Sequence, residues 1–175
     1  AVALVGADVS AERAKEAKLL RVSRFYRALS DMNAALGRLE DAHALYQAAC
    51  EIAVESGQAR LAWVGLLEDD KLVPVAWGGP ARDYLQGLEL RMGPDSGRRG
   101  PSISALVSGQ PSVCNDIESD PLMAPWRERA LLFGVRASGA FPILLEGRPV
   151  GTLNLYFADR NAFDEQLTDL AVRMA

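Results

Sequence analysis

The stretch from Ala137 to Phe157 reads ASGAFPILLEGRPVGTLNLYF and is the clearest β signal in the chain. Two extended runs, 137–145 and 149–157, flank a turn at Glu146 and Gly147, which is typical of a long antiparallel hairpin. In the second run Leu153, Leu155 and Phe157 alternate with Thr152, Asn154 and Tyr156. Because successive strand residues point to opposite faces, we expect a sheet with one apolar face and one hydrogen-bonding face.

A second hairpin is predicted upstream. Residues 61–67 read LAWVGLL, which is apolar on both alternating faces and typical of a covered central strand. A turn at Asp69 and Asp70 leads into a returning strand over 71–77. The next stretch, 82–92, is ambiguous and is interpreted as a short helix around Tyr84 followed by a strand over 88–90.

Short helices and one short strand separate the two hairpins. Pro101 suits the first turn of a helix that Gly109 ends, 111–114 is a brief strand, and a further helix is expected from Trp126 to about Phe133. Asp164 begins a closing helix that stops while still amphipathic, so we expect the natural chain to continue. The order of elements predicts an α+β fold with an antiparallel sheet.

The N-terminal part is predicted to contain two helices. The first ten residues form a frayed lead-in, a helix follows over 11–37, and Asp41 caps a second helix over 42–56. We therefore divide the chain into a linker and signalling helix, 1–38, and a domain, 39–175. The first helix has an apolar stripe that either packs on the domain's own sheet or forms the seam of a parallel dimer. The stripe consists of Val22, Tyr26, Leu29, Asn33 and Leu36, with Phe25, Met32 and Leu39 beside it.

Composition excludes several classes of partner. The 175 residues are 49% hydrophobic and 24% charged, with a net charge of −4 and no basic run, so nucleic acid is not an expected partner. Cys50 and Cys114 form no metal-ligand or disulfide pattern, which favours a reducing cytoplasm. No apolar run is long enough to span a membrane.

Four phrases together resemble a GAF domain: RLAWVGLLEDDKLVPVAWGG (60–79), GRRGPSISALVSGQPSVCNDIESDP (97–121), APWRERALLFGVRASGAFPI (124–143) and GRPVGTLNLYFADRNAFDEQLTDLA (147–171). The resemblance covers residues 41–171. The four phrases are similar to those in sensory modules of bacterial signalling proteins. Such modules precede GGDEF and EAL domains of cyclic di-GMP signalling, or histidine kinase domains. It implies a six-stranded antiparallel sheet with terminal helices on one face, and a ligand cavity under small helices and loops on the other. We assign the polar sheet face to that cavity.

Candidate ligand-binding residues follow from this assignment, each with a structural alternative. Asn115 and Asp116 either accept ligand donors or tie their own loop through Asx-type bonds. Trp126 is a pocket wall or a lid anchor, and Arg127 grips an anion or is solvated. The remaining candidates lie on the predicted hairpin: Ser138, Asn154 and Tyr156.

Departures from better-known GAF classes exclude other activities. The Asn-Lys pair of the cyclic-nucleotide-binding modules is missing, and Cys114 is followed by Asn115 where bilin-binding relatives commonly have histidine. The reductases of this family use a reactive cysteine with a resolving partner, whereas Cys50 falls within a helix and Cys114 is alone in its strand. The single histidine, His43, suits a capping role better than metal or haem ligation. We therefore expect no enzyme activity, cofactor or metal.

Two functions remain open. The first is a sensor, in which an unknown small molecule binds the cavity and the terminal helices relay the change to an output domain in the same chain. The second is a structural dimerisation module without a ligand.

Two further features have less specific interpretations. The loop over 93–100 is interpreted as a surface loop rather than an anion cradle. A redox role of Cys114 is the enzymatic alternative to both functions.

Overall fold

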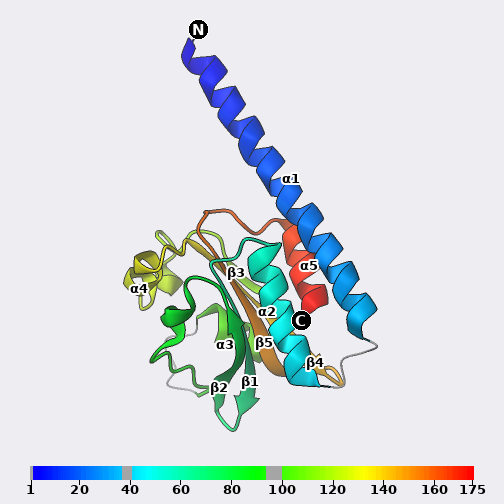
Figure 1. Ribbon diagram of the computed structural model, residues 1–175. Helices are drawn as coiled ribbons and strands as arrows, with labels where there is room; N and C mark the ends of the chain where they lie inside the picture. The colour runs from blue at the N-terminus through cyan, green and yellow to red at the C-terminus, as the bar shows by residue number, and fades with distance from the viewer. Residues whose placement is uncertain (1, 37–40, 94–99) are drawn as a thin grey trace.

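Two hairpins form the centre of the molecule, as their residue patterns predict. The computed structural model describes residues 2–36, 41–93 and 100–175. Strand β1 (Leu61–Glu68) pairs with β2 (Lys71–Gly78), and β4 (Ala137–Leu145) pairs with β5 (Arg148–Phe157). Strands β1 and β5 also pair with each other, and the short β3 (Ser112–Cys114) pairs with β4. All pairs are antiparallel, and the order is β2-β1-β5-β4-β3 (Figure 1).

The strand predicted over 88–90 is absent, so the sheet has five strands within the described residues, one fewer than the resemblance implies. This segment crosses only the beginning of β2. The Leu72 amide donates to the Leu90 carbonyl at 2.9 Å, and Lys71 and Arg91 form an isolated bridge. Too few backbone groups meet there to continue a ladder.

Three helices cover the apolar face of the sheet. They are α1 (Val2–Leu36), α2 (Ala42–Glu55) and α5 (Glu165–Met174) (Figure 1). Asp41 caps α2 by accepting the His43 amide at 3.0 Å, and Asp164 caps α5 by accepting the Leu167 amide at 2.8 Å. The core between these helices and the sheet includes Leu153, Leu155, Phe157, Ala49, Ala53, Leu167 and Leu170.

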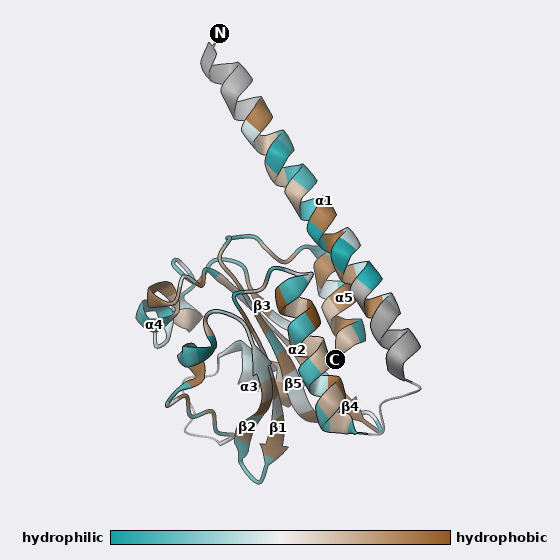
Figure 2. Cartoon of the chain, viewed as in Figure 1, coloured by the Kyte–Doolittle hydropathy of each residue, from teal (hydrophilic) through white to brown (hydrophobic). Residues whose placement is uncertain are grey.

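Helix α1 begins at Val2, so the interpretation of residues 1–10 as a frayed lead-in is wrong for the described part. Its alanine, leucine and charged residues favour continued helix, which outweighs the single Gly6. The N-terminal half extends beyond the domain (Figures 1 and 2). Within the described ranges, no helix combines the length and apolarity needed to cross a bilayer. The proposed boundary between 38 and 39 lies outside the described residues.

The stripe on α1 packs on the chain's own domain over its described part. Val22 and Leu29 are buried, and Phe25 is fully buried, whereas Tyr26 is 46% exposed. Phe25 occupies the space above Gly57, where an added Cβ would lie 1.7 Å from the ring. For Val22 and Leu29 this burial agrees with the first alternative, in which the stripe packs on the chain's own domain, and the dimer seam stays a prediction. The side chains of Asn33 and Leu36 are outside the described residues.

Short helices lie over the other face of the sheet. They are η1 (Arg82–Leu85), α3 (Pro101–Ser108), η2 (Pro121–Met123) and α4 (Arg127–Leu132). Of these, the sequence did not predict η2. A second apolar cluster fills this side and includes Leu61, Trp63, Tyr84, Ile103, Leu106, Met123 and Tyr156. The sheet therefore has a core on each face, and the polar residues of β5 belong to the side covered by the short helices.

Candidate functional site

A small cavity lies between the polar face of the sheet and the short helices. Its volume is about 20 Å³, which is room for about one water molecule. Met123, Trp126 and Tyr156 are among its lining residues, whereas Phe141 lies in the core on the opposite face. The described lining is Tyr84, Leu88, Leu90, Gly100, Pro101, Ser102, Met123, Trp126, Ser138 and Tyr156.

Hydroxyl groups supply the polar character of the cavity. The Trp63 indole donates to the Tyr156 hydroxyl at 3.4 Å. Burial raises the pKa of Tyr156, and hydrogen bonds from Trp63 and Ser102 offset part of that rise. Ser138 is only 2% exposed, and its Oγ has no hydrogen-bond partner among the described residues. A buried hydroxyl without a partner is unfavourable, so this atom is ready to bond a water or a ligand.

Asn154 lies in the same sheet face but is not part of the cavity lining. Its Nδ2 donates to the Thr152 carbonyl at 3.1 Å and to the Thr152 hydroxyl at 2.9 Å, and it approaches the Trp63 carbonyl at 3.4 Å. The Asn154 Oδ1 is buried without a partner in the described part of the chain. This side chain therefore adds a contact between β5 and β1.

Residues 115–127, which we call the roof, contribute Met123 and Trp126 to the lining of the cavity. Asp116 folds the roof locally, since its carboxylate accepts the Glu118 amide at 3.2 Å and the Ser119 hydroxyl at 2.9 Å. Trp126 packs over Gly100, where an added Cβ would lie 3.3 Å from the ring. The same indole is thus both a wall of the cavity and an anchor of the roof.

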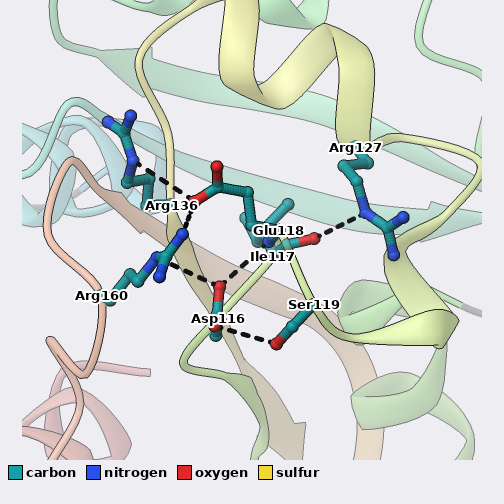
Figure 3. A network of polar contacts seen from close by, with 7 residues as sticks. All are labelled: Asp116, Ile117, Glu118, Ser119, Arg127, Arg136 and Arg160. Atoms are coloured by element: carbon teal, nitrogen blue, oxygen red, sulfur yellow. Dashed lines mark hydrogen bonds and ion pairs between the residues drawn. The ribbon is translucent and has the colours of Figure 1, made fainter.

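Arg127 ties the two ends of the roof together. Its Nε donates to the Ile117 carbonyl at 3.1 Å (Figure 3), and a terminal nitrogen donates to the Asp120 carbonyl at 2.8 Å. Two charge-assisted bonds to backbone carbonyls make the guanidinium a structural clamp. It is outside the described lining of the cavity.

Asn115 joins the roof to a segment far along the chain. Its Nδ2 donates to the Phe163 carbonyl at 2.8 Å, and its Oδ1 accepts the Phe163 amide at 2.9 Å. Both ends of the side-chain amide are therefore used by backbone. Like Asp116 and Arg127, Asn115 does not line the cavity in this structure.

Of the predicted site residues, the cavity thus brings together Trp126, Ser138 and Tyr156. Sequence reasoning missed Tyr84 and Ser102 as lining residues. Ser102 follows Pro101 at the start of a predicted helix, a position that faces the sheet once the helix packs on it. Tyr84 lay in the stretch of ambiguous pattern, and the contact between η1 and the sheet cannot be read locally. The loop over 94–99 lies outside the described residues.

Both cysteines are free and buried. Burial raises the pKa of the Cys50 thiol to about 12 and that of the Cys114 thiol to about 11. Nucleophilic cysteine chemistry needs the thiolate, which these environments disfavour. In the described ranges, no group of three or more His, Cys, Asp or Glu side chains could hold a metal ion.

The thiols give a direct prediction. At pH 8 we expect Cys114 in the native protein to react with iodoacetamide about a hundredfold more slowly than in the unfolded chain, because a pKa about two units higher lowers the thiolate fraction by that factor. Mass spectrometry of carbamidomethylated peptides measures the rates, with urea-unfolded protein as the control. Rapid labelling of native Cys114 would revive the redox alternative.

Comparison with known proteins gives a consistent result. A family model described as GAF domain matches residues 40–175. The free methionine-R-sulfoxide reductase from Neisseria meningitidis superposes with a TM-score of 0.68 at 20% identity, covering 87% of each chain. The GAF domain of a phosphoenolpyruvate-protein phosphotransferase from Coxiella burnetii superposes with a TM-score of 0.64 at 14% identity, covering 90% of this chain and 91% of that one. A domain of a putative two-component sensor histidine kinase from Sinorhizobium meliloti gives 0.56 at 17% identity, covering 78% and 86%. No curated protein gives a match. At these identities the structural likeness shows a common fold.

Proposed function

The chain belongs to the GAF domain family, and from this premise we propose that it is a sensory module that binds a small molecule beneath the roof and relays binding through its terminal helices. The output domain would lie in the same parent chain, of the GGDEF, EAL or histidine kinase type, in a cytoplasmic signalling protein. The proposed ligand contacts are Trp126, Ser138 and Tyr156, with Asn154 behind them. Asn115, Asp116 and Arg127 would act by shaping the roof.

The unpaired hydroxyl of Ser138 is the observation that supports this proposal. It is buried among aromatic and hydroxyl groups, a composition typical of small-molecule sites. Because the cavity holds about one water molecule, any larger ligand must displace part of the lining, and we propose that Met123 and Trp126 of the roof are the part that moves. Ligand binding and roof movement are then one event, and the difference in affinity between the closed and open roof would drive the signal.

A thermal-shift screen of nucleotides, amino acids and aromatic acids on the purified chain tests the proposal. We expect at least one compound to raise Tm, and Ser138→Val to abolish that rise because the valine fills the cavity and removes the hydroxyl. Ser112→Val, on the neighbouring strand β3 and outside the cavity lining, is the matched control and should keep the response. A hit that survives Ser138→Val would place the ligand elsewhere.

Exposed apolar side chains on α1 favour a second candidate, a structural dimerisation module without a ligand. Leu19 and Leu20 are both more than half exposed, and Tyr26 is nearly so. A homodimer through this side of α1 is compatible with the sensor function as well. Sedimentation velocity over a dilution series measures the dimer, and a stable dimer together with an empty ligand screen would favour the structural role.

A further inference from the structure

The loop between β5 and α5, residues 158–164, touches both the roof and α1. Strand β5 ends at Phe157 and α5 begins at Glu165, so this loop follows the strand that supplies Tyr156 to the cavity. Figure 1 shows it passing from the roof side of the sheet to the side of the terminal helices. It is the segment through which movement of one side can reach the other.

On the roof side, Arg160 and the hydrogen bonds of Asn115 connect the loop to the roof. Its guanidinium lies 3.4 Å from the Asp116 carboxylate and also pairs with Glu118, which Arg136 approaches from 3.8 Å (Figure 3). Asn115 adds the two bonds to Phe163 described above, and the Asn161 amide donates to the Asn115 carbonyl at 2.8 Å. Displacement of the roof therefore pulls directly on the loop.

On the helix side, acidic residues of the loop hold α1. Asp159 pairs with Arg21 at 3.0 Å, and Asp164 pairs with Lys18 at 3.0 Å. Arg21 also lies over the Phe157 ring, 5.4 Å from its centroid. Asp164 caps α5, so one carboxylate joins both terminal helices. Burial by itself would raise the pKa of Asp164, but the Leu167 amide and Lys18 together lower it, which keeps this carboxylate ionised.

A groove lies where these ion pairs join α1 to the loop, although the Arg21 side chain itself is only 13% exposed. This groove of about 570 Å³ is lined by residues of α1 between 14 and 21 and by residues 159–162. The ion pairs across it are partly exposed, and such pairs contribute little to global stability. They can therefore rearrange without unfolding the domain, whereas the hydrogen-bonded sheet beneath them cannot.

We propose that the 158–164 loop couples the roof to α1, with Arg160 and Asp159 as the positioning residues at its two contacts. The proposal rests on the sensor function above and specifies its route. Opening of the roof separates Asp116 and Glu118 from Arg160, the loop relaxes, and the restraint on Lys18 and Arg21 is lost. By thermodynamic reciprocity, loosening α1 must loosen the roof by the same factor.

Hydrogen exchange of the ligand-free chain tests the forward direction. Arg160→Gln should speed exchange of the α1 amides between 14 and 22 by about fivefold, the lower end of typical coupling. Arg91→Gln is the matched control, because Arg91 also pairs with an aspartate. The side chains of Arg91 and Arg160 are each 48% exposed. Unchanged α1 exchange in Arg160→Gln, with faster exchange confined to the roof, would overturn the coupling.

Fluorescence tests the reverse direction, because Trp126 belongs to the roof. In a Trp77→Phe background, which removes the exposed indole and leaves the buried Trp63, acrylamide quenching reports on Trp126. Asp159→Asn should raise the quenching constant, whereas Asp70→Asn, which breaks the Arg91 pair, should not. Unchanged quenching in Asp159→Asn would contradict the proposal.

Hydrogen exchange and acrylamide quenching test the coupling without a ligand. Their results can therefore be separated from the result of the ligand screen, which tests the sensor function. A compound that binds through Ser138 while both variants leave the distant element unchanged would support the sensor function and overturn this route. Coupling in both directions together with a failed ligand screen would support the route and count against the sensor function.

Discussion

Replacing Phe25 with alanine is expected to destabilise the protein by about 3 to 5 kcal/mol, the usual cost of truncating a fully buried aromatic residue. Phe25 is the deepest described contact of α1 with the domain, and its ring fills the space above Gly57. We therefore also expect α1 to detach. Urea denaturation measures the free energy of unfolding, and hydrogen exchange at residues 18–30 measures the release of the helix.

Tyr26→Ala is the control for this prediction. Tyr26 is adjacent in sequence but 46% exposed, so its truncation should change the free energy of unfolding by less than about 0.5 kcal/mol. If Tyr26→Ala destabilised the protein as much as Phe25→Ala, and the effect depended on protein concentration, the exposed side of α1 would be an interface between copies.

Arg127→Met is expected to cost about 2 to 4 kcal/mol, because two backbone carbonyls lose a charged donor whose hydrogen bonds each contribute about 1.5 to 3 kcal/mol, reduced here by partial exposure. The roof should loosen with it, so acrylamide quenching of Trp126 should rise. Arg127→Lys should not restore the loss, since an ammonium cannot reproduce the planar geometry that reaches both carbonyls.

Glu128→Gln, on the exposed next residue of α4, is the control and should leave the free energy of unfolding nearly unchanged. A variant that stays stable but loses ligand binding would change the role assigned to Arg127. If Arg127→Met kept wild-type stability but lost binding of a screened compound, the guanidinium would contact the ligand, as the sequence-based alternative holds.

The sheet could be predicted because its signals are local. The alternation from Thr152 to Phe157 and the turn at Glu146 and Gly147 are contained in one short stretch, and so is the assignment of polar and apolar faces. The strand predicted over 88–90 is absent because strand formation there depends on distant residues, not on the local pattern. Whether an extended segment joins a sheet depends on how long it runs beside a partner edge, and here it meets only the first residues of β2.

The site was harder to predict because a polar side chain can bond either a ligand or the protein's own backbone. Asn115 was a reasonable ligand contact from its position after a strand, but its amide is used by the backbone of Phe163, 48 residues away. No local pattern contains that information. Ser138, Trp126 and Tyr156 do line the cavity, and their contact with a ligand stays a prediction. The stripe on α1 was likewise visible, but not the surface that it covers.

The length of α1 turns a small change at the domain into a large displacement far from it. From Val2 to Phe25 the helix spans about 35 Å at 1.5 Å per residue. A tilt of about 10° around the Phe25 contact would therefore move its N-terminal end by about 6 Å. If the proposed coupling holds, the projecting half of α1 would swing about the Phe25 contact, and the salt bridges of Lys18 and Arg21, within about two turns of Phe25, would set its angle.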